Sequence, residues 1–546
     1  MFGKPTKTKK MSRKKKFTDT TIHELSVADN NDKDDCVGDI NMDEKNNIQR
    51  THRFEVDHLK IFFEQEMGAR EVDYGETMAG IVRQFAAELS EEETDTPFYM
   101  VNLSHFARQY LRWNHYLSRI RPFYAVKSNP NGFIIRVLNE LGAGFDCASV
   151  EELDVVRDQC GSNFDCASNI IYAHPCKPVS QIHRFRNAGV QFTVVDNKDE
   201  LKKISVYWPE AKVLLRLRPD DAHSLNPLSS KFGASEHDCI EMLRLGRKLN
   251  IDLIGCTFHV GSRCCDAQIY AESIRMARRI FDVACSNEFG YKFQLLDIGG
   301  GFMGHHSEEP TLPKVAALIN NTLNSLFPEN EGVRLMSEPG RYFSSSGMTL
   351  VCRIIGRRIV TQSRLNQEIL SSPHSLSPYS GDDTDSDANS IEQDEDDAVG
   401  GVCDDQPLPA LAPLPAFSWA QQTYVTTPKI MWMSDKKNIY YINDGIYGTF
   451  NAIIFDQKTF ITHYLRMSSP TEDNEKDISG KNEKHFKSVI FGPTCDSLDC
   501  VAHAIDLPVL NNGDILWFPD VGSYTCSSAS NFNGFKTTKY VLFWNK

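Results

Sequence analysis

The stretch Phe123-Tyr124-Ala125-Val126-Lys127-Ser128-Asn129-Pro130 sets the pattern that most of the chain follows. Its apolar, aromatic residues favour a buried β-strand, and the polar turn after them places a lysine at the carboxyl end of that strand. Because desolvation disfavours the ammonium form, a lysine there can become a neutral nucleophile that forms Schiff bases with carbonyl compounds. Taken alone, the stretch better fits a strand-end lysine whose amine reaches out to water.

Seven more strand-like runs follow, with amphipathic helical stretches between them. Strands that alternate with helices predict parallel pairing through right-handed crossovers. Eight such units over roughly 240 residues match the size of a closed (β/α)8 barrel, and the count of eight favours this fold over a doubly wound open sheet. The eight runs are Phe123–Val126, Gly144–Cys147, Ile170–Ala173, Phe192–Val195, Lys212–Leu217, Leu253–Val260, Gln294–Ile298 and Val333–Met336.

Polar residues and glycines recur at the carboxyl ends of these runs, which is where barrels carry their chemistry. Packing alone does not explain this repeated placement at one end of apolar runs. The residues are Lys127, Asp146, His174, Asp196, Arg216, His259, Gly299 to Gly301, and Glu338.

Three motifs at these strand ends suggest a phosphorylated aromatic cofactor. In Glu338-Pro339-Gly340-Arg341, the carboxylate could face a pyridine nitrogen and the guanidinium could bind phosphate. Gly299-Gly300-Gly301 could expose backbone amides to an anion. His259 could stack on a ring, and Ser262 could donate to phosphate. Each motif also has a plainer interpretation, namely a surface turn, a flexible loop and a structural histidine.

The turn Gly492–Asp499 presents Cys495 beside acidic residues. Acidic neighbours disfavour a thiolate, so a proton donor fits this cysteine better than a nucleophile. An inert loop cysteine is the simpler interpretation of this turn alone.

The bulk composition excludes several classes of protein. The 546 residues carry a net charge of −14, which argues against a general nucleic-acid binder. The fifteen cysteines form no CxxC pair, so neither a zinc site nor a disulfide framework is indicated. No apolar run is long enough to span a bilayer, and no apolar leader follows Met1. We therefore expect a cytoplasmic protein that binds neither nucleic acid nor membrane.

Composition also divides the chain into segments. After residue 342 the alternation of strands and helices gives way to strand-like runs alone, which predicts a C-terminal all-β domain. Those runs are Met348–Val360, Lys437–Asn443, Ala452–Phe455, Lys487–Phe491, Ile515–Trp517 and Tyr540–Trp544. The predicted segments are a disordered tail (1–53, basic and then acidic), an N-terminal segment that joins the β-domain (54–101), the barrel (102–346), and the β-domain (347–546) with a disordered acidic insert (362–428) and a loop insert (468–485).

Nine motifs between Pro122 and Phe535 together resemble one family. They are PFYAVKSN, GFDCAS, IIYAHPCK, FHVGS, LLDIGGGF, SEPGRYF, YYINDGIYGTFN, FGPTCDSLD and NFNGF. The chain resembles the group IV pyridoxal-phosphate-dependent decarboxylases, and within them the eukaryotic members that act on ornithine. The resemblance implies the barrel, the β-domain, and a homodimer whose active sites are shared across the interface.

The resemblance also implies pyridoxal 5'-phosphate as the cofactor. Lys127 would form the Schiff base, Glu338 would face the pyridine nitrogen, and His259 would stack on the ring as a catalytic residue. The implied cofactor-binding residues are Lys127, Asp146, Glu152, Arg216, His259, Ser262, Gly299, Gly300, Gly301, Glu338, Pro339, Gly340, Arg341 and Tyr524.

The implied reaction is the decarboxylation of L-ornithine to putrescine and CO2, the first step of polyamine biosynthesis. Cys495 would protonate the decarboxylated carbon across the dimer, and Asp456 and Asp496 would hold the distal ammonium of the substrate. Phe455 and Phe532 complete the implied substrate pocket. Phe455 departs from the tyrosine that animal enzymes usually carry there.

Two alternatives stay open at this level. A lysine or arginine decarboxylase would share the mechanism, whereas the two aspartates would repel the distal carboxylate of diaminopimelate. A catalytically inactive relative that binds the inhibitor protein antizyme would have lost site residues that this chain keeps. Antizyme could still bind an active enzyme. The segment Lys177–Ala188 resembles the region involved and carries Lys177, Arg184 and Arg186.

Overall fold

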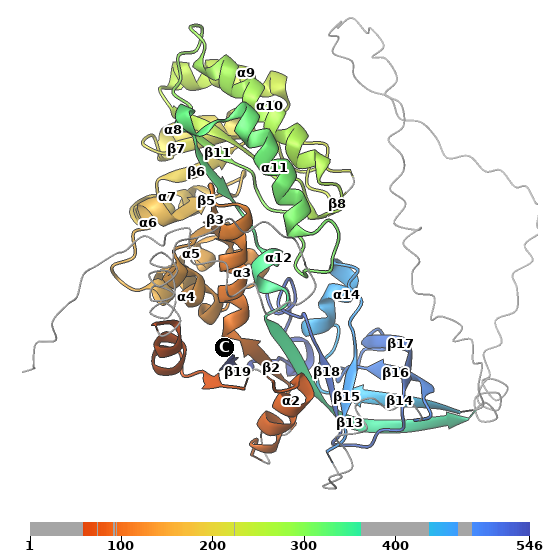
Figure 1. Ribbon diagram of the computed structural model, residues 1–546. Helices are drawn as coiled ribbons and strands as arrows, with labels where there is room; N and C mark the ends of the chain where they lie inside the picture. Colours follow the sequence, from red (N-terminus) through yellow and green to blue (C-terminus); the bar gives the residue numbers. More distant parts are fainter. Residues whose placement is uncertain are drawn as a thin grey trace, which may run out of the picture.

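The structure is a computed structural model that describes residues 58–361, 436–467 and 483–545, apart from 74, 91, 92, 94 and 223. The predicted disordered tail, the predicted acidic insert and most of the predicted loop insert lie outside these residues. The described residues form a barrel, in the upper part of Figure 1, and a sheet domain below it.

Eight parallel strands close into a barrel, as the alternation of runs predicted. The last strand pairs with the first, with Leu335 opposite Ile120 and Ser337 opposite Pro122. The fold is therefore the (β/α)8 barrel. Its strands are β3 (Ile120–Ala125), β4 (Gly144–Cys147), β5 (Ile170–Tyr172), β6 (Phe192–Val195), β7 (Lys212–Leu217), β9 (Asp252–Phe258), β11 (Leu295–Asp297) and β12 (Arg334–Ser337).

Side chains fill the inside of the barrel. Phe123, Ile171, Phe192, Leu214 and Met336 come from five different strands and form one buried cluster. Because the interior is packed, a ligand can bind only at an end of the barrel.

Helices surround the barrel with their apolar faces turned inward. In α4, for example, Ile134, Ile135, Leu138 and Leu141 are all buried, and each such side chain contributes ~1.5–3 kcal/mol. Gly142, at φ +97°, ends this helix in the left-handed conformation that glycine adopts without strain. The surrounding helices are α3 (Leu103–Tyr116), α4 (Gly132–Leu141), α5 (Val150–Cys160), α7 (Val179–Asn187), α8 (Lys198–Tyr207), α9 (Glu236–Leu249), α10 (Gln268–Cys285) and α11 (Leu312–Leu326).

The sheet domain combines strands from both ends of the chain. Strand β2 pairs in parallel with β19 and antiparallel with the long strand β13, so a strand that precedes the barrel becomes part of the sheet that follows it. The described strands run in the order β1-β19-β2-β13-β14-β16-β17, with β18 on β13 and β15 on β18. They are β1 (Arg70–Glu71), β2 (Phe98–Asn102), β13 (Met348–Thr361), β14 (Lys436–Ile442), β15 (His463–Leu465), β16 (Phe486–Phe491), β17 (Cys500–Leu507), β18 (Ile515–Phe518) and β19 (Lys539–Trp544).

One predicted strand is wrong. The run Ala452–Phe455 forms the short helix α14, because the backbone closes on itself when the amides of Asp456 and Lys458 both donate to the Ala452 carbonyl. Local hydrogen bonds here override the strand preference of Ala-Ile-Ile-Phe. The short ribbon of β8 (Ser224–Asn226) and β10 (Ser262–Cys264) was not predicted either.

The remaining helical elements are short except for α2, which begins at the predicted Met78. None of the helices in the described part of the chain has the length and hydrophobicity needed to cross a bilayer. These elements are η2 (Phe62–Glu66), α2 (Met78–Ala87), η3 (Val126–Ser128), α6 (Cys166–Asn169), η4 (Glu329–Glu331), α12 (Arg341–Ser344), η5 (Thr449–Asn451) and η8 (Phe532–Gly534).

Candidate active site

Lys127 lies at the mouth of the barrel, in the turn η3 that follows β3. Its Nζ donates to the carboxylate of Asp146, which is fully buried at the end of the neighbouring strand β4. Burial opposes the ammonium charge, but Asp146, with Tyr524 and Glu338, outweighs it and raises the pKa of Lys127. Asp146 therefore favours the ammonium form of Lys127, which desolvation alone would disfavour.

Both domains fix the turn that carries Lys127. The amide of Tyr524 donates to the Ser128 carbonyl at 2.9 Å, and the Asn129 side chain donates to the Gly522 carbonyl at 2.7 Å. Gly340 packs against the turn so closely that a Cβ atom would lie 2.9 Å from the Ser128 Cβ. The sheet domain therefore contributes directly to the position of the lysine.

Two buried carboxyl groups lie beside this turn. Glu338 hydrogen-bonds with Asp297, and burial together with the Asp297 charge raises the pKa of Glu338 well above its usual value. Asp297 accepts from the Thr257 hydroxyl at 2.8 Å and from the Gly299 amide at 2.9 Å, so it is the ionised partner and Glu338 holds the proton. Asp297 was missed in the sequence, although an aspartate within the apolar run Leu295–Ile298 was the signal for it.

Glu152 lies in the first turn of α5, which follows β4, and Arg216 lies near the end of β7. Glu152 Oε2 accepts from the Ala148 amide at 2.7 Å, and burial raises the pKa of Glu152 to about 7. The Arg216 guanidinium lies over the Phe232 ring, 5.1 Å from its centre. The charge of Lys127 acts on Glu152, and that of Arg216 acts on His259, so both residues lie near the barrel mouth.

His259 lies against the glycine loop. Its Nδ1 accepts from the Gly261 amide at 3.1 Å, and burial, followed by Arg216 and Lys127, lowers the pKa of His259 well below its usual value. The imidazole is therefore neutral. A Cβ on Gly300 would lie 3.0 Å from the His259 Nε2, and one on Gly299 would lie 2.1 Å from the Phe258 carbonyl oxygen. Only glycine leaves space here for the ring.

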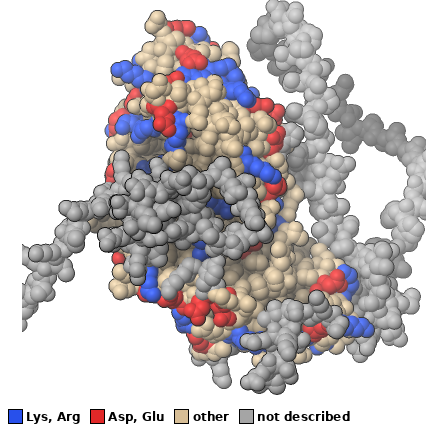
Figure 2. All heavy atoms as spheres, viewed as in Figure 1, with Lys and Arg blue, Asp and Glu red and all other residues tan. Residues whose placement is uncertain are grey.

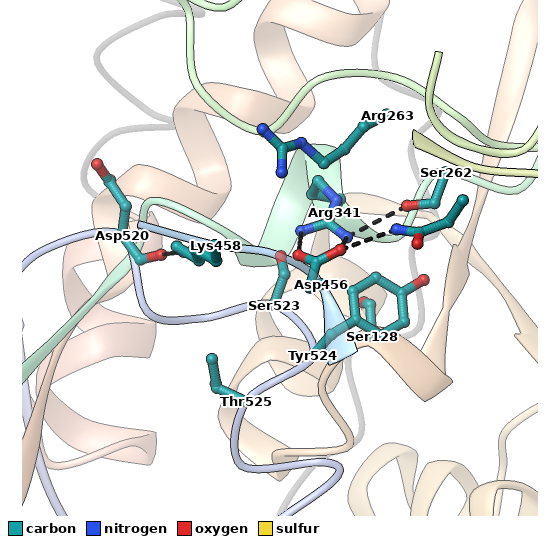
Figure 3. A network of polar contacts seen from close by, with 12 residues as sticks. Ser128, Ser262, Arg263, Arg341, Asp456, Lys458, Asp520, Ser523, Tyr524 and Thr525 are labelled. Carbon is teal, nitrogen blue, oxygen red and sulfur yellow. Dashed lines mark hydrogen bonds and ion pairs between the residues drawn. The ribbon is translucent and has the colours of Figure 1, made fainter. Parts of the chain in front are cut away.

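Arg341 forms the centre of a second group (Figure 3). Its two terminal nitrogens donate to the Asp456 carboxylate at 2.8 and 3.0 Å, and one of them also donates to the Ser262 Oγ at 3.2 Å. The guanidinium lies over the Tyr524 ring, 4.8 Å from its centre. Asn226, which the sequence did not suggest, donates to Asp456 at 2.9 Å.

A buried lysine adjoins this group. Lys458 donates to the Asp520 carbonyl, and burial, followed by the charge of Arg341, lowers the pKa of Lys458 to about 8. Apart from its position near Asp456, nothing in the sequence indicated this lysine.

The backbone around this second group is strained. Arg263, Gln457, Asp520 and Tyr524 have φ values of +55°, +49°, +60° and +51°, which non-glycine residues rarely adopt. Such conformations persist where the surrounding structure fixes them, and they concentrate at functional sites.

Cys495 lies in an exposed turn of the sheet domain. Its amide donates to the Asn533 side chain at 3.1 Å, and the next residue, Asp496, accepts from the Tyr447 hydroxyl. The Tyr447 ring packs on Phe532, with ring centres 4.4 Å apart. Within the described residues, no hydrogen bond or ion pair joins this turn to the barrel mouth, so the structure does not bring Cys495 to Lys127.

The predicted antizyme segment is less basic at its surface than its sequence suggests. Lys177 is buried and forms an ion pair with Glu200 at 3.1 Å, so it is not available to a partner. Arg184 pairs with Asp154, and Arg186 pairs with Glu210. On the face of the molecule in Figure 2, basic and acidic side chains are likewise intermixed.

Pyridoxal phosphate fits the residues at the barrel mouth. Three buried polar atoms there, Asp146 Oδ1, Glu338 Oε1 and Arg341 Nε, have no hydrogen-bond partner in the part of the chain that the structure describes. A carboxyl group suits a pyridine nitrogen, a guanidinium N–H suits a phosphate oxygen, and Lys127 supplies an amine for the aldehyde.

Two segments match one family of known proteins. Residues 103–345 match the pyridoxal binding domain of the pyridoxal-dependent decarboxylases, and residues 417–522 match their C-terminal sheet domain. This chain belongs to the pyridoxal-dependent decarboxylases. The family assignment agrees with the barrel, the sheet domain and the fit of the cofactor.

Similar proteins in this family include enzymes and a regulator. The chain is 34% identical to ornithine decarboxylase of Mus musculus over 478 residues, which is 88% of this chain and 87% of that protein. It is also 34% identical to antizyme inhibitor 2 of Xenopus laevis over 472 residues, which is 86% of each.

Solved structures with this fold cover nearly the same part of the chain. The Paramecium bursaria Chlorella virus arginine decarboxylase bound to agmatine has a TM-score of 0.65 at 25% identity, covering 86% of this chain and all of that one. The lysine/ornithine decarboxylase of Vibrio vulnificus complexed with putrescine has a TM-score of 0.61 at 25% identity. The match covers 85% of this chain and 99% of that one.

Proposed function

We propose that this decarboxylase converts L-ornithine to putrescine and CO2, the first step of polyamine biosynthesis. The observation that carries the proposal is the Lys127–Asp146 pair at the barrel mouth, beside Glu338 and close to the Arg341 group. Its presence in a chain 34% identical to curated ornithine decarboxylases supports the substrate.

In this mechanism the site's own residues hold the cofactor at both ends. Arg341, Ser262, Tyr524 and the glycine loop would hold the phosphate, and Glu338 would face the ring nitrogen. Bound pyridoxal phosphate supplies an electron sink for the charge left on the α-carbon when CO2 departs. Glu338 Oε1 is buried and has no hydrogen-bond partner among the described residues, so it is the carboxyl oxygen that would face the ring nitrogen.

Proton transfer is the task of Lys127 and Cys495. Lys127 must lose a proton before its Nζ can attack a carbonyl carbon, and Asp146 is the carboxylate in contact that can accept it. The neutral imidazole of His259 would cover the face of the ring without adding positive charge. Cys495 donates a proton to the decarboxylated carbon.

Carboxylates select the substrate. Ornithine carries a second cation at the end of its side chain, so Asp456 and Asp496 would favour it over neutral amino acids. Asp456 is bound to Arg341 in this structure, and Asp496 lies in the exposed Cys495 turn. Phe455 and Phe532 would flank the aliphatic part of the substrate.

The first experiment is a CO2-release assay with ornithine, lysine and arginine, together with an absorbance scan before and after borohydride. We expect a visible band that borohydride removes, a reduced adduct on Lys127, and a preference for ornithine. A preference for lysine or arginine would support the proposed reaction class but contradict ornithine as the substrate. Failure to bind the cofactor after reconstitution would overturn the proposal.

A homodimer would complete the site. Large apolar side chains are exposed in the same segments that carry the proposed substrate and proton-donor residues, namely Ile454 (58%), Phe455 (70%), Leu498 (63%) and Phe532 (42%). Exposed apolar residues gathered in this way mark an interaction surface. A second copy of the chain on this face would bring its own Cys495 to the first copy's Lys127.

Subunit mixing tests the shared site. Lys127→Ala and Cys495→Ala are each expected to be nearly inactive alone. If the site is shared, random mixing of the two restores about a quarter of the wild-type activity, because half of the dimers contain one intact site. If the site lies within one chain, mixing restores nothing.

Antizyme binding is the second candidate function, because antizyme inhibitor 2 is among the similar proteins. The arginines of the α7 segment are paired with acids, and its lysine is buried, which weakens the case from that segment. A pull-down with purified antizyme tests it, and loss of ornithine turnover on binding would establish regulation.

We also propose a cytoplasmic location. The described cysteines are free thiols, several of them buried, as expected where disulfides do not form. Microscopy of a fluorescent fusion tests this, and a secretory pattern would contradict it.

A further inference from the structure

Arg263 has an unusual place in the β8–β10 ribbon. Its neighbours Ser262 and Cys264 pair with Asn226 and Ser224 of the opposite strand. Arg263 itself has a φ of +55°, a conformation that strains every residue except glycine. A strained residue in so short a ribbon needs a reason other than strand formation.

The guanidinium of Arg263 lacks the partners that a buried guanidinium normally has. Its Nε is buried and has no hydrogen-bond partner among the described residues. The carboxylate that approaches it, that of Glu308, is 3.9 Å from Nη2, which is too long for a hydrogen bond. The side chain is nevertheless only 24% accessible, so water does not fully replace such a partner.

Several contacts place Arg263 in the Arg341 group. Ser262, its neighbour in sequence, accepts from Arg341. Glu308 accepts from the amide of Gly304, where a Cβ would lie 3.1 Å from the Arg341 Cγ. Figure 3 draws Arg263 and Arg341 within the same polar network. Two guanidinium groups therefore share one small region.

The Arg341 guanidinium has the same kind of unused donor. Both of its terminal nitrogens are bound to Asp456, whereas its Nε is buried and without a partner in the described part of the chain. Two unused Nε–H donors thus lie close to one serine hydroxyl. Lys458 adds a third cation to this region, beside the carboxylates Asp456, Asp520 and Glu308. The two unused donors call for an acceptor, and a phosphate oxygen suits a guanidinium N–H.

We propose that Arg263 is a second phosphate-binding arginine, which acts with Arg341 on the phosphate of pyridoxal phosphate. The inference rests on the proposed cofactor. Charge-assisted hydrogen bonds from a guanidinium to phosphate are among the stronger polar interactions in proteins, so the second arginine raises phosphate affinity. The backbone strain is then explained by the direction that it gives to the side chain.

The test compares pyridoxal phosphate with pyridoxal, which lacks the phosphate. Both are titrated into the full-length apoprotein by fluorescence, for the wild type, Arg263→Ala, Arg263→Gly and the control Arg279→Ala. Arg279 is a surface residue paired with Glu236. We expect both Arg263 variants to raise the Kd for pyridoxal phosphate by about 10- to 100-fold and to leave the Kd for pyridoxal unchanged. Arg279→Ala should change neither.

Thermal unfolding of the same apoproteins separates binding from folding. Glycine accepts a positive φ without strain, so Arg263→Gly should unfold at the wild-type temperature or above it. Equal loss of affinity for both ligands, or no loss for either, would overturn the role of Arg263 while the wild type still binds the cofactor. A wild type that binds neither ligand would instead overturn the proposed function and this inference with it.

Discussion

The barrel mouth and the Cys495 turn carry the two halves of the proposed catalytic set, and they differ in burial. Asp146 and Asp297 are fully buried, and Glu338 is 5% exposed. Cys495 and its neighbour Leu498 are exposed. Charged groups that are buried away from water need partners that their own chain fixes in place. Groups on an exposed turn can contribute to a buried site only where another surface covers them. Removing the partner of a buried charge should therefore lower stability and activity together at the barrel mouth, whereas mutations in the turn should lower activity alone.

The largest effect is expected from Lys127→Ala. It removes the proposed nucleophile, so the rate of CO2 release from ornithine should fall about 10⁴-fold or more. It also leaves Asp146 buried without its cation, which should lower the free energy of unfolding by ~3 kcal/mol in urea titrations. Lys212→Ala, at the other end of the barrel strands, is the control and should affect activity little. If Lys127→Ala were as stable as the wild type, the proposed difference between the barrel mouth and the Cys495 turn would be contradicted.

Cys495→Ala should lower kcat about 10²-fold, because it removes a proton donor. Since the side chain is exposed, the unfolding temperature should stay at the wild-type value. Cys285→Ala, another exposed cysteine, should change neither quantity. A fall in unfolding temperature that parallels the loss of rate would mean that the turn is part of the folded core of its own chain.

The smallest expected effect comes from Glu152→Gln and depends on pH. Burial raises the folded-state pKa of Glu152 to about 7, so its contribution to stability is complete below about pH 4.5 and is lost as the pH rises through about 7. Glutamine does not ionise, so the variant apoprotein should be ~2 kcal/mol more stable than wild type at pH 8 and similar at pH 4.5.

Urea titrations at the two pH values measure this difference. Glu151→Gln, at the exposed neighbouring position, is the control for replacing a carboxylate in the first turn of α5. A gain of equal size at both pH values would contradict a titrating Glu152.

The barrel was predictable because each of its eight strands ends in a recognisable way. Apolar runs predicted the strands, and the residues after them, such as Lys127 and Glu338, marked the functional end. Asp297 was missed but could also have been predicted, because an ionisable residue within a buried strand requires polar partners.

Other parts of the site depend on conformation that residue types do not specify. The positive φ of Arg263 is one such feature, because nothing in an arginine side chain favours that backbone conformation. The pairing of Asp456 with Arg341 joins residues 115 positions apart and follows from the docking of the sheet domain. Helix α14 forms in place of a strand because backbone amides nearby donate hydrogen bonds to its own first carbonyl. Charge balance, likewise, raises the pKa of Lys127, although desolvation alone would lower it.

The parallel pairing of β2 with β19 has a consequence for how this protein is made. Ser104, just after β2, exchanges hydrogen bonds with Asn545, 441 positions later. Synthesis runs from the amino end, so β2 leaves the ribosome long before the strand that pairs with it. During that interval the edge of β2 is open to other chains. The barrel can close during translation, whereas completion of the sheet domain waits until β19 has emerged.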